Sequence, residues 1–237
     1  MLRILYFLAF VFSAKSASAP FIKPCKKGDS ACVMKSAKAA LPTFVAGIPD
    51  LGVKTLDPLQ LALISSDERG LKVKLIDSVL TGLKDCTLEN VKNDMDKMKQ
   101  TVEVNCNMVL KGNYTLSGQL LILPVQGEGK YKIDIKDIVI KVVGDIATNT
   151  GEDGKQHWHI SKWKHNYNVK KNVRFTFENL FNGNKALAEP VIEFANNNWK
   201  DVMQEIAPPI VRAIVSEVVD ALEALYKAVP AEELYVA

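Results

Sequence analysis

The stretch that decides the fold is residues 184–230, NKALAEPVIEFANNNWKDVMQEIAPPIVRAIVSEVVDALEALYKAVP. Apolar residues recur every three or four positions from Leu187 to Leu225, which predicts a helix with one apolar stripe. About 43 residues, at a rise of about 1.5 Å each, give a helix about 64 Å long with a kink at Pro208-Pro209. A compact globule of this length would be only about 44 Å across. The sequence therefore predicts an elongated molecule.

The middle of the chain, residues 70–180, alternates apolar and polar residues with a period of two, which is typical of strands with one buried face. The run KYKIDIKDIVIKVV (130–143) would be about 48 Å long if straight, whereas strands usually have about five or six residues. Its apolar phase changes between Ile135 and Ile138. This change predicts a β-bulge, which would let one long strand bend.

The helix and the strands together predict the architecture. The chain has no second long helical pattern, so the apolar stripe of the helix must be buried against the sheet. A sheet that wraps a helix about 10 Å wide leaves space inside. We therefore predict an α+β fold in which a long curved antiparallel sheet wraps around one long C-terminal helix, with an internal apolar tunnel.

The N-terminal residues predict secretion. Arg3, the apolar run ILYFLAFVF (4–12) and small residues up to Ala19 have the layout of a signal peptide, which we place at residues 1–19. No linker or repeat divides residues 20–237, which we interpret as a single domain. Within it, DSACVMKSAKAAL (29–41) predicts a short helix that ends at Pro42, and GIPDLGVKTLDPL (47–59) predicts an extended segment rich in turns.

The four cysteines are interpreted first as disulfide partners, because a secreted chain folds in an oxidising compartment. Cys25 and Cys32 form the most local pair, and loop entropy alone gives such a bridge about 2.5 kcal/mol. Cys86 and Cys106 flank a turn centred near Asp96 and would face each other across a hairpin. Two alternatives stay open for this second pair: a bridge, or two unpaired buried thiols.

The charge balance excludes a strong electrostatic partner. Without Arg3 and Lys15 the chain has 28 basic and 27 acidic residues, a net charge of +1. We therefore expect no nucleic-acid partner and no stable association with a membrane. Asn113-Tyr114-Thr115 is an N-glycosylation sequon, so Asn113 is a candidate glycosylation site.

Sequence signatures of enzymes and metal sites are absent. The chain has no GxSxG, GxxxxGK[ST] or HExxH motif, so we predict no catalytic residues and no cofactor. His157 and His159 would lie about 7 Å apart on one strand face, but His165 would lie about 26 Å from His157. With no third ligand nearby, we predict no metal site.

Five motifs in the same order make the mature chain resemble the insect juvenile-hormone-binding and takeout proteins. The motifs are CKKGDSAC (25–32), GIPDLGVKTLDPL (47–59), GNYTLSGQLLILPVQGEGKYKI (112–133), FNGN (181–184), and NNNW (196–199) followed by VPAEELY (229–235). The resemblance implies a tubular lipid-binding roll around a hydrophobic ligand. It also implies roles of the kind proposed for takeout proteins, in feeding, circadian output and chemosensation.

The ligand class follows from the same resemblance. The hormone carriers of the blood typically have a second bridge involving the long helix, but no cysteine follows Cys106 here. This difference favours the takeout-like branch, whose ligands include terpenoids, fatty-acid-like and other long-chain lipids, and it argues against juvenile hormone, which stays a less favoured member of the expected ligand class. We expect a secreted, monomeric carrier whose only partner is a small hydrophobic ligand, with the clasped N-terminal region and the VPAEELY tail as its gates.

The candidate tunnel-lining residues share a strand face or the helix stripe. Tyr131, Tyr167 and Trp199 also have a polar atom that could orient an oxygen of the ligand. The candidates are Val73, Leu75, Met108, Leu120, Ile122, Tyr131, Ile133, Trp163, Tyr167, Phe175, Phe177, Trp199, Ile214 and Val218.

Two other functions compete with the carrier. One is a membrane-active or lipopolysaccharide-binding defence protein of the same fold, which vesicle co-sedimentation would detect. The other is a lipid-modifying hydrolase, which would turn over a long-chain ester. The near-neutral charge and the missing catalytic motifs favour the carrier over both.

Overall fold

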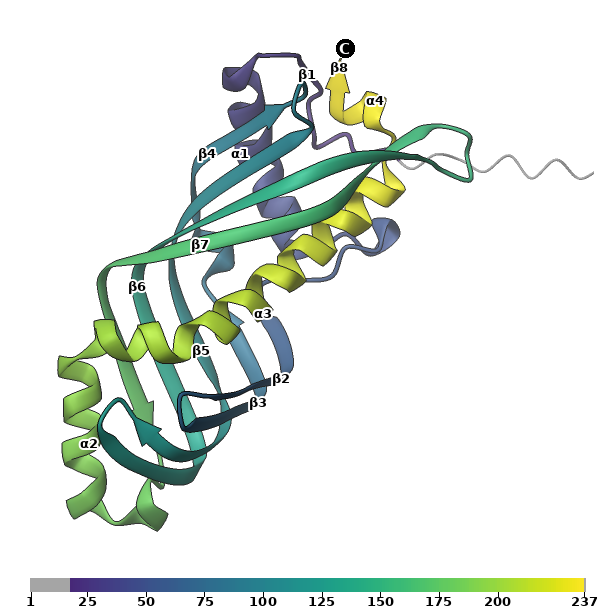
Figure 1. Ribbon diagram of the computed structural model, residues 1–237. Helices are drawn as coiled ribbons and strands as arrows, with labels where there is room; N and C mark the ends of the chain where they lie inside the picture. The colour runs from purple at the N-terminus through teal and green to yellow at the C-terminus, as the bar shows by residue number, and fades with distance from the viewer. Residues whose placement is uncertain (1–17, 237) are drawn as a thin grey trace, which may run out of the picture.

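The computed structural model describes residues 18–236, so the predicted signal peptide lies outside the described residues except for Ser18 and Ala19. In chain order the elements are β1 (Cys25–Lys26), α1 (Ser30–Ala46), η1 (Pro49–Leu51), β2 (Leu59–Glu68), β3 (Leu71–Thr81), η2 (Leu83–Asp85), β4 (Thr87–Asp94), β5 (Lys99–Leu120), β6 (Leu123–Thr150), β7 (Gln156–Phe177), η3 (Phe181–Gly183), α2 (Lys185–Asn197), α3 (Trp199–Ala228), α4 (Ala231–Leu234) and β8 (Tyr235–Val236). The molecule is elongated, with α3 running along its length against the curved sheet (Figure 1).

The main sheet is a half-barrel closed by a helix. Its strand order is β2-β3-β5-β6-β7, and β4 pairs with the first half of β5. All pairings in this sheet are antiparallel, and β6 alone is 28 residues long. The helix α3 contacts β7 and β2, the two edge strands. This is the predicted α+β fold of a curved sheet around a long C-terminal helix.

The predicted bulge in β6 is confirmed at Asp137. The register shifts between Cys106 and Met108 in β5 and between Lys136 and Ile138 in β6. Asp137 has a φ of 60°, and its backbone N–H donates to Asn107 Oδ1 at 3.0 Å. Side chains thus replace the strand bonds that the bulge removes, and the long strand can bend there.

The single C-terminal helix that the sequence predicts is broken in two. α2 ends at Asn197 and α3 begins at Trp199, whereas Pro208 and Pro209 lie inside α3 without ending it. The asparagine run is at the break: Asn198 Nδ2 donates to the Phe194 carbonyl at 2.8 Å, and such local side-chain bonds compete with helical bonds. Asn196 fixes the end of α2 to β7, because its Oδ1 accepts from the N–H of Phe175 at 2.8 Å and its Nδ2 donates to the Phe175 carbonyl at 3.1 Å.

The N-terminal helix is longer than predicted. It continues through Pro42 to Ala46, and Gly47 is its C-cap. The φ of Gly47 is 89°, in the left-handed region that glycine adopts more readily than other residues. Pro42 itself is exposed, whereas Val45 is buried at 4% exposure and Phe44 packs against the core. Burial of these two side chains offsets the backbone hydrogen bond that proline removes.

Segments from the two ends of the described chain meet beside α1, at what we call the clasp end. The Cys25–Cys32 disulfide joins β1 to the first turn of α1, as predicted. β1 pairs in parallel with β8, and the Ala19 N–H donates to Glu233 Oε2 at 3.3 Å. The Cys86–Cys106 disulfide is also formed, which resolves the open alternative for the second pair in favour of a bridge.

The interior of the half-barrel at the opposite end of the molecule, beside α2, is packed with side chains, and we call this the solid end; an open pocket of about 520 Å³, which Trp199 borders, lies between β7 and α2 at its surface. Tyr114 and Phe177 meet edge to face with ring centroids 4.9 Å apart, and Tyr131 stacks on Phe177 at 6.2 Å. Phe175 is 1% exposed, and Met108 is fully buried. Large side chains therefore fill the interior of the half-barrel at this end.

Candidate functional site

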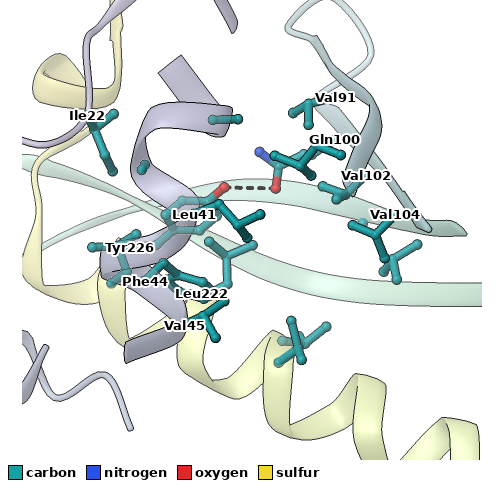
Figure 2. Close-up of a pocket in the computed structure, with 18 of the residues that line it drawn as sticks. Ile22, Leu41, Phe44, Val45, Val91, Gln100, Val102, Val104, Leu222 and Tyr226 are labelled. Atoms are coloured by element: carbon teal, nitrogen blue, oxygen red, sulfur yellow. Dashed lines mark hydrogen bonds between the residues drawn. The ribbon is translucent and has the colours of Figure 1, made fainter. Parts of the chain in front are cut away.

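An apolar cavity of about 290 Å³ lies at the clasp end, between α1, the sheet and α3. Figure 2 shows that its wall combines residues of α1, such as Leu41 and Phe44, with Val102 and Val104 of β5 and Leu222 of α3. The space that the sequence predicts inside the fold is thus present as a cavity at one end. Most of the side chains that border it are aliphatic.

Residues of α1, α3, α4, β1, β4, β5, β6 and β7 and of the segments that connect them line the cavity. The lining residues are Phe21, Ile22, Lys23, Cys25, Val33, Ser36, Ala37, Ala40, Leu41, Phe44, Val45, Leu56, Leu83, Cys86, Leu88, Val91, Asn93, Gln100, Val102, Val104, Ile140, Val142, Gly144, Trp158, Ile160, Trp163, Ile214, Val215, Val218, Val219, Leu222, Leu225, Tyr226 and Leu234. Each disulfide contributes one lining residue, Cys25 or Cys86. Both bridges therefore tie down segments that border the cavity.

One polar chain crosses the otherwise apolar wall. The Tyr226 hydroxyl donates to Gln100 Oε1 at 2.8 Å, and Gln100 Nε2 donates to Asn93 Oδ1 at 3.0 Å. Asn93 and Gln100 are cross-strand partners on β4 and β5, so the register of this hairpin holds the amide in place. Burial raises the pKa of Tyr226, so its phenol stays neutral at physiological pH.

Only part of the predicted lining set borders the cavity. Trp163, Ile214 and Val218 line it. Val73 and Leu75 border a second pocket of only about 10 Å³ between β2, β3 and α3. Ligand contact by the first three residues stays a proposal that the cavity geometry supports.

The remaining predicted residues lie elsewhere. Met108, Leu120, Tyr131, Ile133 and Phe175 are buried in the packed core, and Tyr167, Phe177 and Trp199 are partly buried against it. Ile122, which was expected to face the interior, lies in the turn between β5 and β6 and is 73% exposed. Strand parity identifies the inner face of a sheet, but it does not show where along that face the space stays empty.

Alkaline pH is expected to weaken the solid end. Burial raises the pKa of Tyr131 and of Tyr114 from 10.0 to about 12. Each tyrosine therefore contributes stability in full below about pH 10 and loses it as the pH rises through about 12, because only the unfolded chain gives up its proton readily there. Urea unfolding at about pH 9 and pH 11 would show this loss. Tyr131→Phe should make the loss smaller, and an unchanged loss in that variant would contradict the assignment.

The histidines bind protein groups rather than one another. His157 is buried and lies between the Tyr226 carbonyl, 3.2 Å from Nδ1, and Asp153, 3.1 Å from Nε2. His159 Nδ1 bonds Glu223. Among residues 18–236 no cluster of three potential metal ligands occurs. These histidines fix the β6–β7 hairpin to the end of α3.

The sequence pattern contains signals for the residues that the predicted set omits. Gln100 continues the parity of Val102 and Val104, and Tyr226 follows Val218 and Leu222 at intervals of four on the helix stripe. A polar residue that continues an apolar stripe can indicate a group facing a cavity. The α1 residues were missed because the position of that helix over the hairpin depends on tertiary packing.

The fold and the cavity define a class of protein, the half-barrel that a long helix closes around an apolar space. The chain belongs to the family of haemolymph juvenile hormone binding proteins (JHBP), whose family model matches residues 5–236. It is similar to the crystal structure of Takeout 1 from Epiphyas postvittana, with a TM-score of 0.87 and 36% identity over 91% of this chain and 100% of the other. This similarity covers both the curved sheet and the long helix.

Two further relatives are less similar in sequence. The circadian clock-controlled protein daywake of Drosophila melanogaster is 26% identical over 226 residues, which cover 90% of this chain and 86% of that protein. A candidate beta-carotene-binding protein of Schistocerca gregaria is 23% identical over 134 residues, which cover 54% of this chain and 53% of that protein. Within residues 18–236, no helix combines the length and the apolar character needed to cross a membrane.

Proposed function

We propose that this protein is a secreted carrier that holds one small hydrophobic molecule in the cavity at the clasp end. The observation that carries the proposal is the cavity itself, about 290 Å³ of mostly apolar space inside a folded chain. At about 15 to 30 Å³ for each water-sized group, it has room for about ten to twenty non-hydrogen atoms. A terpenoid or an acyl chain of that size is the class of ligand that fits.

Burial of the ligand supplies the affinity. Each methylene removed from water contributes about 0.8 kcal/mol, so ten of them contribute about 8 kcal/mol before ordering costs. Micromolar affinity corresponds to about 8.2 kcal/mol. The wall itself stays anchored on the disulfides and on α3, so little of this free energy is needed to order the protein.

Uptake and release would take place at the clasp end. α1 covers the cavity there, and the neighbouring contacts are few: the two-residue pairing of β1 with β8, the Ala19–Glu233 bond, and the ion pair of Lys155 with Glu232 at 2.6 Å. Segments held by few contacts open at low free-energy cost. We expect their amides to exchange hydrogen faster than those of β5 and β6. Equal protection would argue against a gate at this end.

Several features support secretion as a monomeric binder that does not transform its ligand. All four cysteines are bridged, which suits an oxidising compartment. Asn113 is exposed on β5, where a glycan would face solvent. The side chains around the cavity hold no nucleophile and base within bonding distance of one another.

Native mass spectrometry of the protein purified from its source tests the proposal directly. We expect a complex with one hydrophobic molecule, which solvent extraction releases, together with displacement of a fluorescent apolar probe by that extract. A protein that carries no molecule and binds no apolar probe at micromolar concentration would refute the carrier function. Mass analysis of the same sample before and after glycan removal tests the modification of Asn113.

A further inference from the structure

Building on the proposed function, we propose that Gln100 and Tyr226 form a polar anchor that binds an uncharged oxygen of the ligand, as in an alcohol, ketone or ester, and that the cavity disfavours free carboxylates. The anchor would set which end of a hydrophobic ligand lies against Gln100 and Tyr226.

Gln100 and Tyr226 keep hydrogen-bonding groups that no described protein group pairs with, in a mostly apolar cavity. The Tyr226 hydroxyl uses its proton on Gln100, and one N–H of Gln100 is used on Asn93. The second N–H of Gln100 and the lone pairs of the Tyr226 oxygen have no protein partner within residues 18–236. Such groups cost free energy when they are kept from water without a partner. A ligand oxygen can accept from Gln100, and a ligand hydroxyl can also donate to Tyr226.

The surrounding side chains make this anchor distinct. Figure 2 shows the bond between Tyr226 and Gln100 among apolar groups that include Val91, Val102 and Leu222. Ser36, the uncharged polar lining residue outside the chain of Asn93, Gln100 and Tyr226, is already paired with the backbone of Lys23 through both its donor and its acceptor. Polar recognition inside the cavity therefore falls on the chain of Asn93, Gln100 and Tyr226.

The same lining provides no buried cation. Lys23 is the only lining residue with a charged side chain, and it is exposed. A carboxylate that reached Gln100 would lose its water without gaining an opposite charge, whereas a neutral oxygen needs only a hydrogen-bond donor. The cavity is thus suited to an uncharged oxygenated ligand.

Neighbouring residues hold the Tyr226 side of the anchor in place. Trp158 packs edge to face on the Tyr226 ring with centroids 5.3 Å apart, and His157 Nδ1 lies 3.2 Å from the Tyr226 carbonyl. Tyr226 itself is 4% exposed. A hydroxyl that the protein holds in place can discriminate between ligands because little ordering cost is left at binding.

Matched ligands and two variants test the anchor. Dodecane, undecan-2-one, undecan-1-ol and decanoic acid have equal numbers of non-hydrogen atoms, and displacement of N-phenyl-1-naphthylamine measures their affinities at neutral pH. We expect Gln100→Leu to lower the affinity for the ketone and the alcohol about fivefold to tenfold relative to the affinity for dodecane, and Tyr226→Phe to do the same for the alcohol. Gln119→Leu, an exposed change on β5, is the matched control. Decanoate should bind at least about tenfold more weakly than the ketone and should recover when acidification protonates it.

The results of these measurements distinguish a failure of the polar anchor from a failure of the carrier function. If the probe and dodecane bind but both variants keep the same ratio of alcohol to dodecane affinity as the unchanged protein, the anchor is refuted and the carrier function stands. Decanoate that binds as tightly as the ketone, with an affinity that Lys23→Met reduces, would place the polar end of the ligand at the surface instead and also refute the anchor. If neither the probe nor any ligand binds, the carrier function itself fails.

Discussion

Val218→Trp is expected to weaken ligand binding about 100-fold while the fold is retained. Val218 lies on α3 between Ile214 and Leu222, and all three line the cavity. The indole ring would occupy space that about three or four methylene groups of the ligand need. At about 0.8 kcal/mol for each methylene, the loss is about 3 kcal/mol, which corresponds to about two factors of ten in affinity.

Displacement of a fluorescent apolar probe measures this effect, and a thermal melt checks the fold. Gln204→Trp adds the same side chain at an exposed position of the same helix and should change neither result. Full binding by Val218→Trp, in a protein that melts normally, would mean that the ligand lies outside the cavity at the clasp end.

Phe175→Ala is expected to destabilise the protein by about 3 to 5 kcal/mol without changing the affinity of the folded protein for its ligand. Phe175 is 1% exposed at the solid end, where neighbouring side chains leave little room to collapse around a lost ring. It does not line the cavity. Stability and binding should therefore separate at this residue.

Phe44→Ala is the matched comparison for Phe175→Ala. Phe44 is partly exposed and already faces the cavity, so its loss removes fewer packing contacts. We expect it to cost less than half as much stability and to change the affinity instead. Urea unfolding and probe binding of the two variants would reveal the contrast, and equal effects of both changes on binding would show that the two ends are not independent.

Much of the fold could be predicted because periodicity reports which side of an element is buried. The shift of apolar phase between Ile135 and Ile138 correctly predicted the bulge, and the bridge between Cys86 and Cys106 is one of the two alternatives that the hairpin around Asp96 left open. The end of α1 was predicted wrongly, and the break before α3 was not predicted. In the first case the packing of Phe44 overrode the local preference of proline, and in the second the side-chain bonds of Asn198 and Asn196 interrupt the helical pattern.

The cavity was harder to predict because its position depends on which side chains of opposite elements do not contact one another across the interior. Trp163, Ile214 and Val218 border the cavity, whereas Phe175 on the same sheet face is fully packed. The parity pattern is alike for both strand residues, Trp163 and Phe175. Their different positions follow from which side chains of α1, α2 and α3 lie opposite, and that information is tertiary.

The bond between Ala19 and Glu233 joins residues 214 positions apart, and the pairing of β1 with β8 spans almost the same separation. Contacts between such distant positions have a large entropic cost of loop closure. This cost becomes smaller only after the intervening sheet and helix have formed. The hollow end should therefore be the last part of the molecule to assemble. A ligand bound in the cavity should then stabilise these late contacts by mass action, because it binds only the chain in which they have formed.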